Sequence, residues 1–295
     1  MEGRLTAARF FILLVLQFNI YDFMKYPVIA LDLDGTLTNN RKEVTPRTRR
    51  ALARAAAQGA VVVLASGRPT YGIAPVAEVL APDCPEIYIL SYNGGKIVHW
   101  SSHRELYAKH LPDEVLPLLV HYAETHRYAL VGYKDNRIIT QRPDDPYVAE
   151  EARINRMEIC GVEKLLPNIE KHPVKLLLAG HPDDMMRAEQ ELALLLENKM
   201  DVFRSAPFFV ELVPKGIDKA QSLQRLLAHL QLTPSDLLAF GDGYNDLSMI
   251  KLAGMGVAMD NAAPELRAVA DRITLSNEDD GVAVVLEELE RENQE

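Results

Sequence analysis

The sequence predicts an α/β protein in which a doubly wound parallel sheet carries an inserted α+β domain. Apolar strand-like runs alternate with helix-like segments at both ends of the chain, which is typical of parallel sheets covered by helices on both faces. Between these parts, from about residue 94 to residue 210, short strands and amphipathic helices follow a different rhythm. The 295 residues, 48% of them hydrophobic, suffice for two domains.

The first part of the sheet is expected from alternating strands and helices at 28–31, 45–59, 60–66, 71–80 and 86–91. The first helix has clear end signals, because Thr45 can cap its start, Pro46 fits the first turn and Gly59 can stop it. A strand, a helix and a second buried strand form a parallel unit with a right-handed crossover.

The parallel rhythm resumes near the C-terminus with segments expected at 219–232, 236–240, 244–254, 255–258 and 264–271. The intervening region predicts strands at 96–100, 128–133, 137–140, 174–180 and 208–213, and helices at 113–126 and 183–199. We therefore expect a core domain made of residues 24–92 and 212–295, and an inserted domain at 93–211.

Residues 1–23 are expected to be an upstream extension without function. The apolar run Phe10–Leu16 is too short to span a bilayer, and a start at Met24 leaves a complete domain. The two cysteines, Cys84 and Cys160, are too few for a disulfide framework, so a reducing cytoplasm is expected. A net charge of -10 argues against nucleic acid as a partner. The sequence leaves the oligomeric state open.

Polar residues follow several expected strands at the point where each strand ends. Asp32 and Asp34 are two positions apart after the first strand, so both carboxylates point the same way and repel each other. The carboxyl ends of parallel strands meet at one edge of the sheet, where ligands bind. The residues expected at this edge are Asp32, Asp34, Ser66, Lys219, Asp242 and Asp246.

Grouped aspartates suit a hard cation such as Mg²⁺, which takes one or two carboxylates and keeps other positions for water and a substrate phosphate. Asp32 can then attack phosphorus as a nucleophile, and Asp34 can act as general acid and then as base. Ser66 and the N–H groups around Gly67 can hold phosphate oxygens, while Lys219 offsets the charge that builds during transfer. Each motif alone is also compatible with an ordinary turn or helix cap.

The stretches "DLDGT", "ASGR", "PKGIDKAQSL" and "GDGYNDLSM" resemble the four motifs of the haloacid dehalogenase superfamily, specifically its Cof-type (class IIB) phosphatases. The resemblance extends over Met24 to Leu286 and implies a Rossmann-like core. It also implies that Asp32 is the nucleophile and a Mg²⁺ ligand, that Asp34 is the acid/base and offers the metal its backbone carbonyl, and that Asp242 is a further metal ligand.

The same resemblance implies a set of phosphate contacts, namely the backbone of Leu33 with Ser66, Gly67, Lys219 and Asn245. Asp246 is implied to lie behind this layer, where it holds Lys219 or the metal's waters. Two departures from the family pattern remove no catalytic group: Asp260 stands in "MDNA" where glycine is usual, and Tyr244 stands where glutamate is common.

The long stretch between Ser66 and Lys219 implies, by the same resemblance, a C2-type cap that closes over the site. Asn93 and Gly94 stand where the chain enters this cap, and are expected to be either a hinge with a substrate contact or a plain turn. Within the cap, Asp144 and Asp145 lie between prolines and predict an ordinary loop.

These features predict a cytoplasmic, Mg²⁺-dependent phosphatase that hydrolyses small phosphorylated metabolites, sugar phosphates first among them, through an aspartyl-phosphate intermediate. Neither a nucleic acid nor a membrane is expected as a partner. One alternative is a phosphomutase or phosphotransferase that uses the same intermediate with a sugar hydroxyl as acceptor. Another is a regulator that only binds a phosphorylated metabolite.

Overall fold

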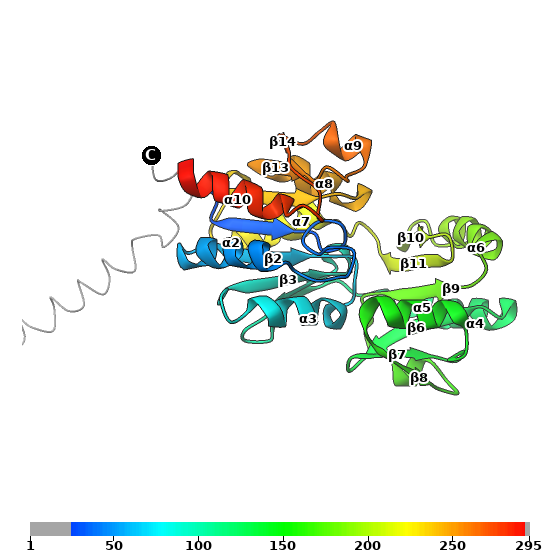
Figure 1. Ribbon diagram of the computed structural model, residues 1–295. Helices are drawn as coiled ribbons and strands as arrows, with labels where there is room; N and C mark the ends of the chain where they lie inside the picture. Colours follow the sequence, from blue (N-terminus) through cyan, green and yellow to red (C-terminus); the bar gives the residue numbers. More distant parts are fainter. Residues whose placement is uncertain (1–24, 293–295) are drawn as a thin grey trace, which may run out of the picture.

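The computed structural model describes residues 25–292, which form two lobes, each built on its own sheet (Figure 1). The expectation for residues 1–23 lies outside the described residues. Within the described part, no helix combines the length and the apolar character needed to cross a membrane.

The larger lobe contains an eight-stranded sheet in the order β14-β13-β12-β1-β2-β3-β4-β5. All neighbours from β14 to β3 are parallel, whereas β3, β4 and β5 are joined as antiparallel pairs. The strands are β1 (Val28–Leu31), β2 (Val61–Ala65), β3 (Ile87–Ser91), β4 (Lys96–His99), β5 (Arg104–Ala108), β12 (Leu237–Gly241), β13 (Met255–Ala258) and β14 (Arg272–Ile273).

The parallel strands are apolar runs because helices cover them and shield them from water. Helices α2 and α10 lie side by side in this lobe, and α7 packs beside α8 (Figure 1). Thr45 caps α2 as expected, since its side chain accepts a hydrogen bond from the Thr48 N–H. The helices are α2 (Pro46–Ala57), α3 (Thr70–Leu80), α7 (Lys219–His229), α8 (Leu247–Leu252), α9 (Pro264–Arg267) and α10 (Gly281–Glu292).

The chain runs from β1 outward to β3 on one side and later from β12 to β14 on the other. The direction of strand order therefore reverses between β1 and β12, which are hydrogen-bonded neighbours with Leu31 opposite Phe240. In open parallel sheets, ligands bind outside the carboxyl ends of the strands at such a switch point. This topology sets where the site must be.

The smaller lobe contains a six-stranded sheet in the order β10-β11-β9-β6-β7-β8. Helices α4 and α6 share one apolar cluster with this sheet, and residues of α5 belong to a second cluster that also contains Tyr92 of the larger lobe. The elements are α4 (Leu116–His126), β6 (Ala129–Lys134), β7 (Arg137–Thr140), α5 (Pro146–Asn155), β8 (Glu158–Gly161), β9 (Leu176–Ala179), α6 (Pro182–Leu195), β10 (Met200–Ala206) and β11 (Phe209–Pro214).

Two features differ from the sequence-based expectation. Strands β4 and β5 fall within residues 93–211, yet they pair with β3 and extend the larger sheet, so this antiparallel edge belongs to the core lobe. The segment around Asp145 is not only a loop, because Asp145 caps α5 by accepting a hydrogen bond from the Tyr147 N–H. The "DDP" sequence is thus an N-cap followed by proline in the first turn.

Candidate active site

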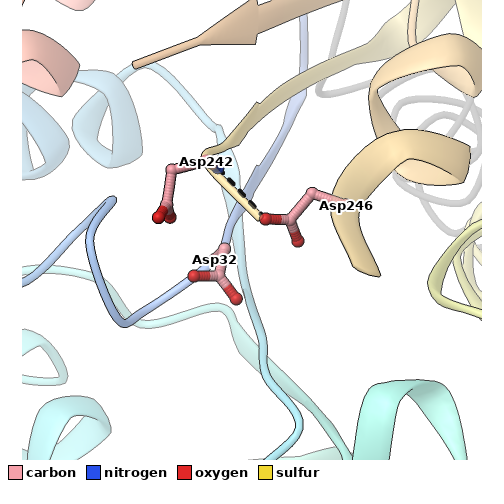
Figure 2. A group of neighbouring side chains, drawn as sticks. All are labelled: Asp32, Asp242 and Asp246. Carbon is pink, nitrogen blue, oxygen red and sulfur yellow. Dashed lines mark hydrogen bonds between the residues drawn. The ribbon is translucent and has the colours of Figure 1, made fainter. Parts of the chain in front are cut away.

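Asp32 and Asp242 lie at the switch point of the larger sheet, immediately after β1 and β12. The Asp32 N–H donates to the carbonyl of Phe240 at 3.1 Å, which continues the pairing of the two strands to the edge of the sheet. Figure 2 shows the side chains of Asp32, Asp242 and Asp246 lying close together. The structure thus brings Asp32 together with two carboxylates that lie more than two hundred residues further along the chain.

Lys219 joins two of these carboxylates. Its ammonium lies 2.7 Å from Asp32 Oδ1 and 2.6 Å from Asp246 Oδ1, and its side chain is fully buried. Lys219 is the first residue of α7, where Asp218 caps the helix by accepting from the Gln221 N–H. The capped helix start therefore fixes the lysine at the sheet edge.

Asp246 is bound on both of its carboxylate oxygens. Oδ1 accepts from Lys219, while Oδ2 accepts from the backbone N–H groups of Asp242 at 3.1 Å (dashed in Figure 2) and Gly243 at 2.9 Å. Its role in this geometry is to hold Lys219 and the loop after β12.

The three carboxylates are short of positive charge. One oxygen from each of Asp32, Asp242 and Asp246 lies within 4.8 Å of the others, and Lys219 is the one ammonium among them. Burial and the neighbouring Asp246 raise the pKa of Asp32 to about 8, although Lys219 opposes this. Burial also raises the pKa of Asp242 to about 6. Two uncompensated negative charges and hard oxygen donors fit one divalent cation such as Mg²⁺.

The loop after β1 is shaped around Asp242. Gly35 has a φ of +87°, and any side chain there would collide with the Asp242 carboxylate. Thr36 Oγ1 donates to Asp242 Oδ1 at 2.6 Å, and Asn261 Nδ2 donates to the Gly35 carbonyl at 2.8 Å. Leu33 is buried in the same loop, and its carbonyl accepts from the Thr38 N–H. Thr36 and Asn261 are supporting contacts that the sequence analysis did not assign.

Asp34 points to a different set of partners. Arg68 binds its carboxylate with two parallel hydrogen bonds of 2.7 and 2.6 Å, and Lys42 lies 2.6 Å from Oδ1. Burial alone would raise the pKa of Asp34, but the hydrogen bonds and charges of Arg68 and Lys42 outweigh it and lower that pKa below its ordinary value. Arg68 was missed as a functional residue although it lies within the "ASGR" motif, two positions after Ser66.

Ser66, Gly67, Asn93 and Asn245 meet beside the carboxylates. The Asn93 N–H donates to the Ser66 carbonyl at 2.9 Å, and Asn245 Nδ2 donates to Asn93 Oδ1 at 3.0 Å. The Asn93 side chain lies directly against Gly67, so a larger residue at 67 would displace it. Asn93 has a φ of 55°, a left-handed conformation that asparagine tolerates better than most residues.

Gly94 completes the tight turn between β3 and β4 of the larger sheet. Its φ is +96°, and a side chain there would meet Ser222 and the Asp218 backbone at the start of α7. The Ser222 hydroxyl donates to the Gly94 carbonyl. The turn at 93–94 is therefore tied directly to the helix that carries Lys219.

A cavity of about 700 Å³ joins the sheet edge to the smaller lobe. Its lining includes Asp32, Ser66 and Asp242 from the larger lobe and Glu151, Asn155, Lys175 and Glu211 from the smaller lobe. None of these four residues was assigned from the sequence. A usable signal existed for two of them, because Lys175 and Glu211 are single charges inside the apolar stretches "VKLLLAG" and "FFVELV".

An α/β sheet with carboxylates, a buried lysine and a roomy cavity at its switch point defines a hydrolase of the phosphoryl-transfer type. A sequence profile of haloacid dehalogenase-like hydrolases matches residues 29–286. The chain belongs to this family, and its activity class is that of a phosphatase.

Similar proteins support this assignment. A haloacid dehalogenase-like hydrolase from Bacteroides thetaiotaomicron, known from a crystal structure, is 48% identical in sequence and superposes with a TM-score of 0.87. The match covers 90% of this chain and 100% of that protein. The Bacillus subtilis (strain 168) protein "Putative phosphatase YkrA" is 30% identical, covering 90% of this chain and 98% of YkrA. The 5-amino-6-(5-phospho-D-ribitylamino)uracil phosphatase YitU of the same organism is 28% identical, covering 88% of this chain and 96% of YitU.

Proposed function

We propose that this phosphatase depends on Mg²⁺ and hydrolyses small phosphorylated metabolites, sugar phosphates first among them, through a phosphorylated Asp32. The proposal rests on one observation: the buried contact of Asp32 with Lys219 beside two further carboxylates at the open edge of the sheet. Phosphoryl transfer requires a nucleophile in line with phosphorus and positive charge near the phosphate oxygens. Asp32 and Lys219 supply these two requirements.

Asp32, Asp242 and the backbone carbonyl of Asp34 are the proposed Mg²⁺ ligands. When bound, the ion neutralises the repelling carboxylates and draws charge from the phosphate oxygens. Asp246 is assigned to Lys219 instead of the ion, since both of its oxygens already accept hydrogen bonds.

In the first step, an ionised oxygen of Asp32 forms a bond to phosphorus while the bond from phosphorus to the leaving oxygen breaks. Asp34 gives that oxygen a proton. In the second step, a water molecule attacks the phosphorus of phosphorylated Asp32 and Asp34 takes the water's proton. This releases inorganic phosphate and restores the Asp32 carboxylate. The groups proposed to hold the phosphate are the Leu33 backbone, Ser66, Gly67, Lys219 and Asn245.

The pairing of Asp34 with Arg68 and Lys42 favours its ionised form, which is the form needed to accept a proton from water. In the first step, the negative charge of a substrate phosphate beside Asp34 raises its pKa and opposes the two cations. Asn93 and Gly94 are assigned as positioning residues, because the first aligns Asn245 and the second ties the turn to α7.

Sugar phosphates are supported as substrates by the size of the cavity and by its polar lining on both lobes. The name of YitU describes a substrate in which a ribityl chain carries the phosphate. The net charge of -10 continues to argue against a nucleic-acid partner. The cytoplasm remains the proposed compartment, since Cys84 and Cys160 are both free thiols.

The decisive experiment is to quench the enzyme with acid during turnover of p-nitrophenyl phosphate and to map phosphorylation by mass spectrometry. A phosphoryl group on Asp32 that forms with Mg²⁺ and not with a chelator is expected. Release of one inorganic phosphate per p-nitrophenol separates hydrolysis from transfer to a sugar hydroxyl. Steady turnover with no label on Asp32 contradicts the proposed intermediate.

A further inference from the structure

The smaller lobe places a buried polar cluster on the wall of the cavity that contains Asp32 and Ser66. The cluster consists of Tyr133, Glu151, Lys175, Ser205 and Glu211, and we call it the cap cluster. Val210 and Leu212 pack into the apolar cluster with α4 and α6, so Glu211, between them on β11, points to the opposite face of the sheet. The cap cluster therefore lies on the face of the sheet that is turned toward the active site.

The cap cluster is held by a chain of short contacts. Lys175 Nζ lies 2.7 Å from Glu211 Oε2, and the Ser205 hydroxyl donates to Glu211 Oε1 at 2.7 Å. The Tyr133 hydroxyl donates to Glu151 Oε1, also at 2.7 Å. Lys175, Glu151 and Glu211 are all buried, so the positions of these groups are set by the fold and not by solvent.

Two carboxyl groups in the cap cluster share one ammonium. Burial raises the pKa of Glu151 above its ordinary value, even though Lys175 and the Tyr133 hydroxyl oppose this. Asn155, on the same helix as Glu151, does not add to this set: its Oδ1 is buried against Gly72 of α3 and has no hydrogen-bond partner among residues 25–292. The cap cluster therefore contains one more carboxyl group than ammonium groups.

The cations that line the cavity are already paired. Among the lining residues that the structure describes, these are Arg68 with Asp34, Lys175 with Glu211, and Arg204 with Glu189. A second anionic group on a substrate would therefore enter a buried acidic wall without a cation of its own. Removing an ionised group from water without a partner is strongly unfavourable.

We propose that Glu151 accepts hydrogen bonds from the hydroxyl groups of the substrate's leaving group, and that the cap cluster rejects leaving groups that carry a second negative charge. The substrate class is thus a phosphomonoester of an uncharged polyhydroxylated compound. This inference rests on the proposed function, because it assumes that the phosphate is bound at Asp32. It adds to that function the residues that select the leaving group and the property by which they select it, namely the absence of a second negative charge, which we call the charge rule.

The test compares glucose 6-phosphate, which has an uncharged leaving group, with 6-phosphogluconate, which adds a carboxylate, using the wild-type enzyme and Mg²⁺. Sorbitol 6-phosphate, which is open-chain like 6-phosphogluconate but uncharged, is the control for shape and should react like glucose 6-phosphate. We expect kcat/KM to be at least about tenfold higher for glucose 6-phosphate, as a single unpaired charge in a buried site costs at least this much. Equal or higher kcat/KM for 6-phosphogluconate overturns the inference. Because wild-type enzyme is used, this result does not depend on a variant that folds.

Glu151→Gln tests the residue assignment, because glutamine can still accept from the Tyr133 hydroxyl but lacks the charge. The ratio of kcat/KM for the two substrates should fall at least about threefold in this variant, by removal of one nearby negative charge. Glu191→Gln is the matched control: Glu191 lies on α6, which packs on the other face of the same sheet, and its loss should leave the ratio unchanged. An equal ratio in wild type and Glu151→Gln overturns the assignment.

The two levels of the proposal fail in different ways. Turnover of p-nitrophenyl phosphate that requires Asp32, combined with no discrimination between the sugar phosphates, leaves the proposed function intact and overturns only the charge rule. A preference for pyridoxal phosphate over every sugar phosphate likewise overturns the polyhydroxyl class. Absence of turnover with any of these compounds contradicts the proposed function and the inference together.

Discussion

The molecule buries a lysine among carboxyl groups in two places, and the two clusters differ in charge. At the sheet edge, Lys219 faces Asp32 and Asp246, with Asp242 close by, so three carboxylates share one ammonium. In the smaller lobe, Lys175 is paired with Glu211, and Glu151 is the one further carboxyl group. The first cluster lacks two positive charges, whereas the second lacks at most one.

The anchoring of the two clusters also differs. Backbone N–H groups hold Asp246, while side-chain hydroxyl groups hold Glu151 and Glu211. Backbone donors fix the core cluster in one geometry, as a covalent step requires. This difference supports the two proposals, a core cluster that binds a cation for chemistry and a cap cluster that selects a neutral leaving group.

The largest expected effect comes from Asp32→Asn, which removes the proposed nucleophile from the core cluster. We expect kcat for p-nitrophenyl phosphate to fall at least about 1,000-fold, as is usual when a covalent nucleophile is lost. The circular dichroism spectrum should not change, since asparagine has the same shape. Asp83→Asn, in an exposed pair with Arg49 far from the site, is the control and should retain full activity. A variant at position 32 with near-normal kcat contradicts the proposed mechanism.

The two lysines provide the next comparison. Lys219→Met and Lys175→Met each leave buried carboxyl groups without their cation, and each should lower the free energy of unfolding by about 3–5 kcal/mol. Urea denaturation measures this loss. The two variants should differ in their response to Mg²⁺: the ion should restore more stability to Lys219→Met than to Lys175→Met. Equal responses would contradict the expected repulsion between Lys219 and the ion.

Removal of the metal tests the core cluster in the unaltered chain. A ligand present at 100 times its Kd stabilises the folded state by about 2.7 kcal/mol, so Mg²⁺ should raise the unfolding free energy by that order compared with a chelator. Asp242→Asn should lose most of this gain, whereas Glu211→Gln, in the cap cluster, should keep it. If Mg²⁺ still raised the unfolding free energy of Asp242→Asn by the same amount, the ion would bind outside the core cluster.

The different anchoring also explains how much of each cluster could be predicted from the sequence. Asp32 and Asp242 each follow an apolar strand directly, and parallel strands bring their carboxyl ends to one edge, so local motifs were sufficient. Lys219 was predictable for a similar reason, as the first residue of a capped helix.

The cap cluster has no such local signature. Glu151 lies on α5, a helix that the sequence analysis interpreted as part of a loop because of the "DDP" motif. Glu211 lies in β11, where antiparallel pairing with β9 places it opposite Leu177. Register of this kind depends on the whole sheet and not on neighbouring residues. Strand pairing also explains why the inserted domain does not begin at residue 93 as expected. The strands β4 and β5, which follow that residue, pair antiparallel with β3 and with each other and so extend the larger sheet.

A pH series examines the cap cluster alone. The pKa of Glu151 is raised in the folded protein, first of all by burial, above its ordinary value of 4.5. The folded state therefore binds this proton more tightly than the unfolded state, and the associated stability is lost as the pH rises from 4.5 through the folded pKa. Glu151→Gln does not titrate, so wild type should lose stability relative to this variant in urea denaturations as the pH is raised above about 4.5. A constant difference contradicts the raised pKa.

The smallest expected effects come from the two N-caps that position the clusters. Asp218 caps α7, which carries Lys219, and Asp145 caps α5, which carries Glu151. Asp218→Ala and Asp145→Ala should each cost about 1 kcal/mol of unfolding free energy, so their stabilities are matched.

Their kinetics should nevertheless differ. Displacement of Lys219 in Asp218→Ala affects the phosphate itself, so kcat should fall for p-nitrophenyl phosphate and for glucose 6-phosphate alike. Displacement of Glu151 in Asp145→Ala affects the leaving group, so the ratio of kcat/KM for glucose 6-phosphate over 6-phosphogluconate should fall while turnover of p-nitrophenyl phosphate changes less. If both variants lowered turnover of all three substrates by the same factor, the two clusters would not have the separate roles proposed for them. Because the caps lie outside both clusters, a separation of their kinetics can arise only from the helices that they begin.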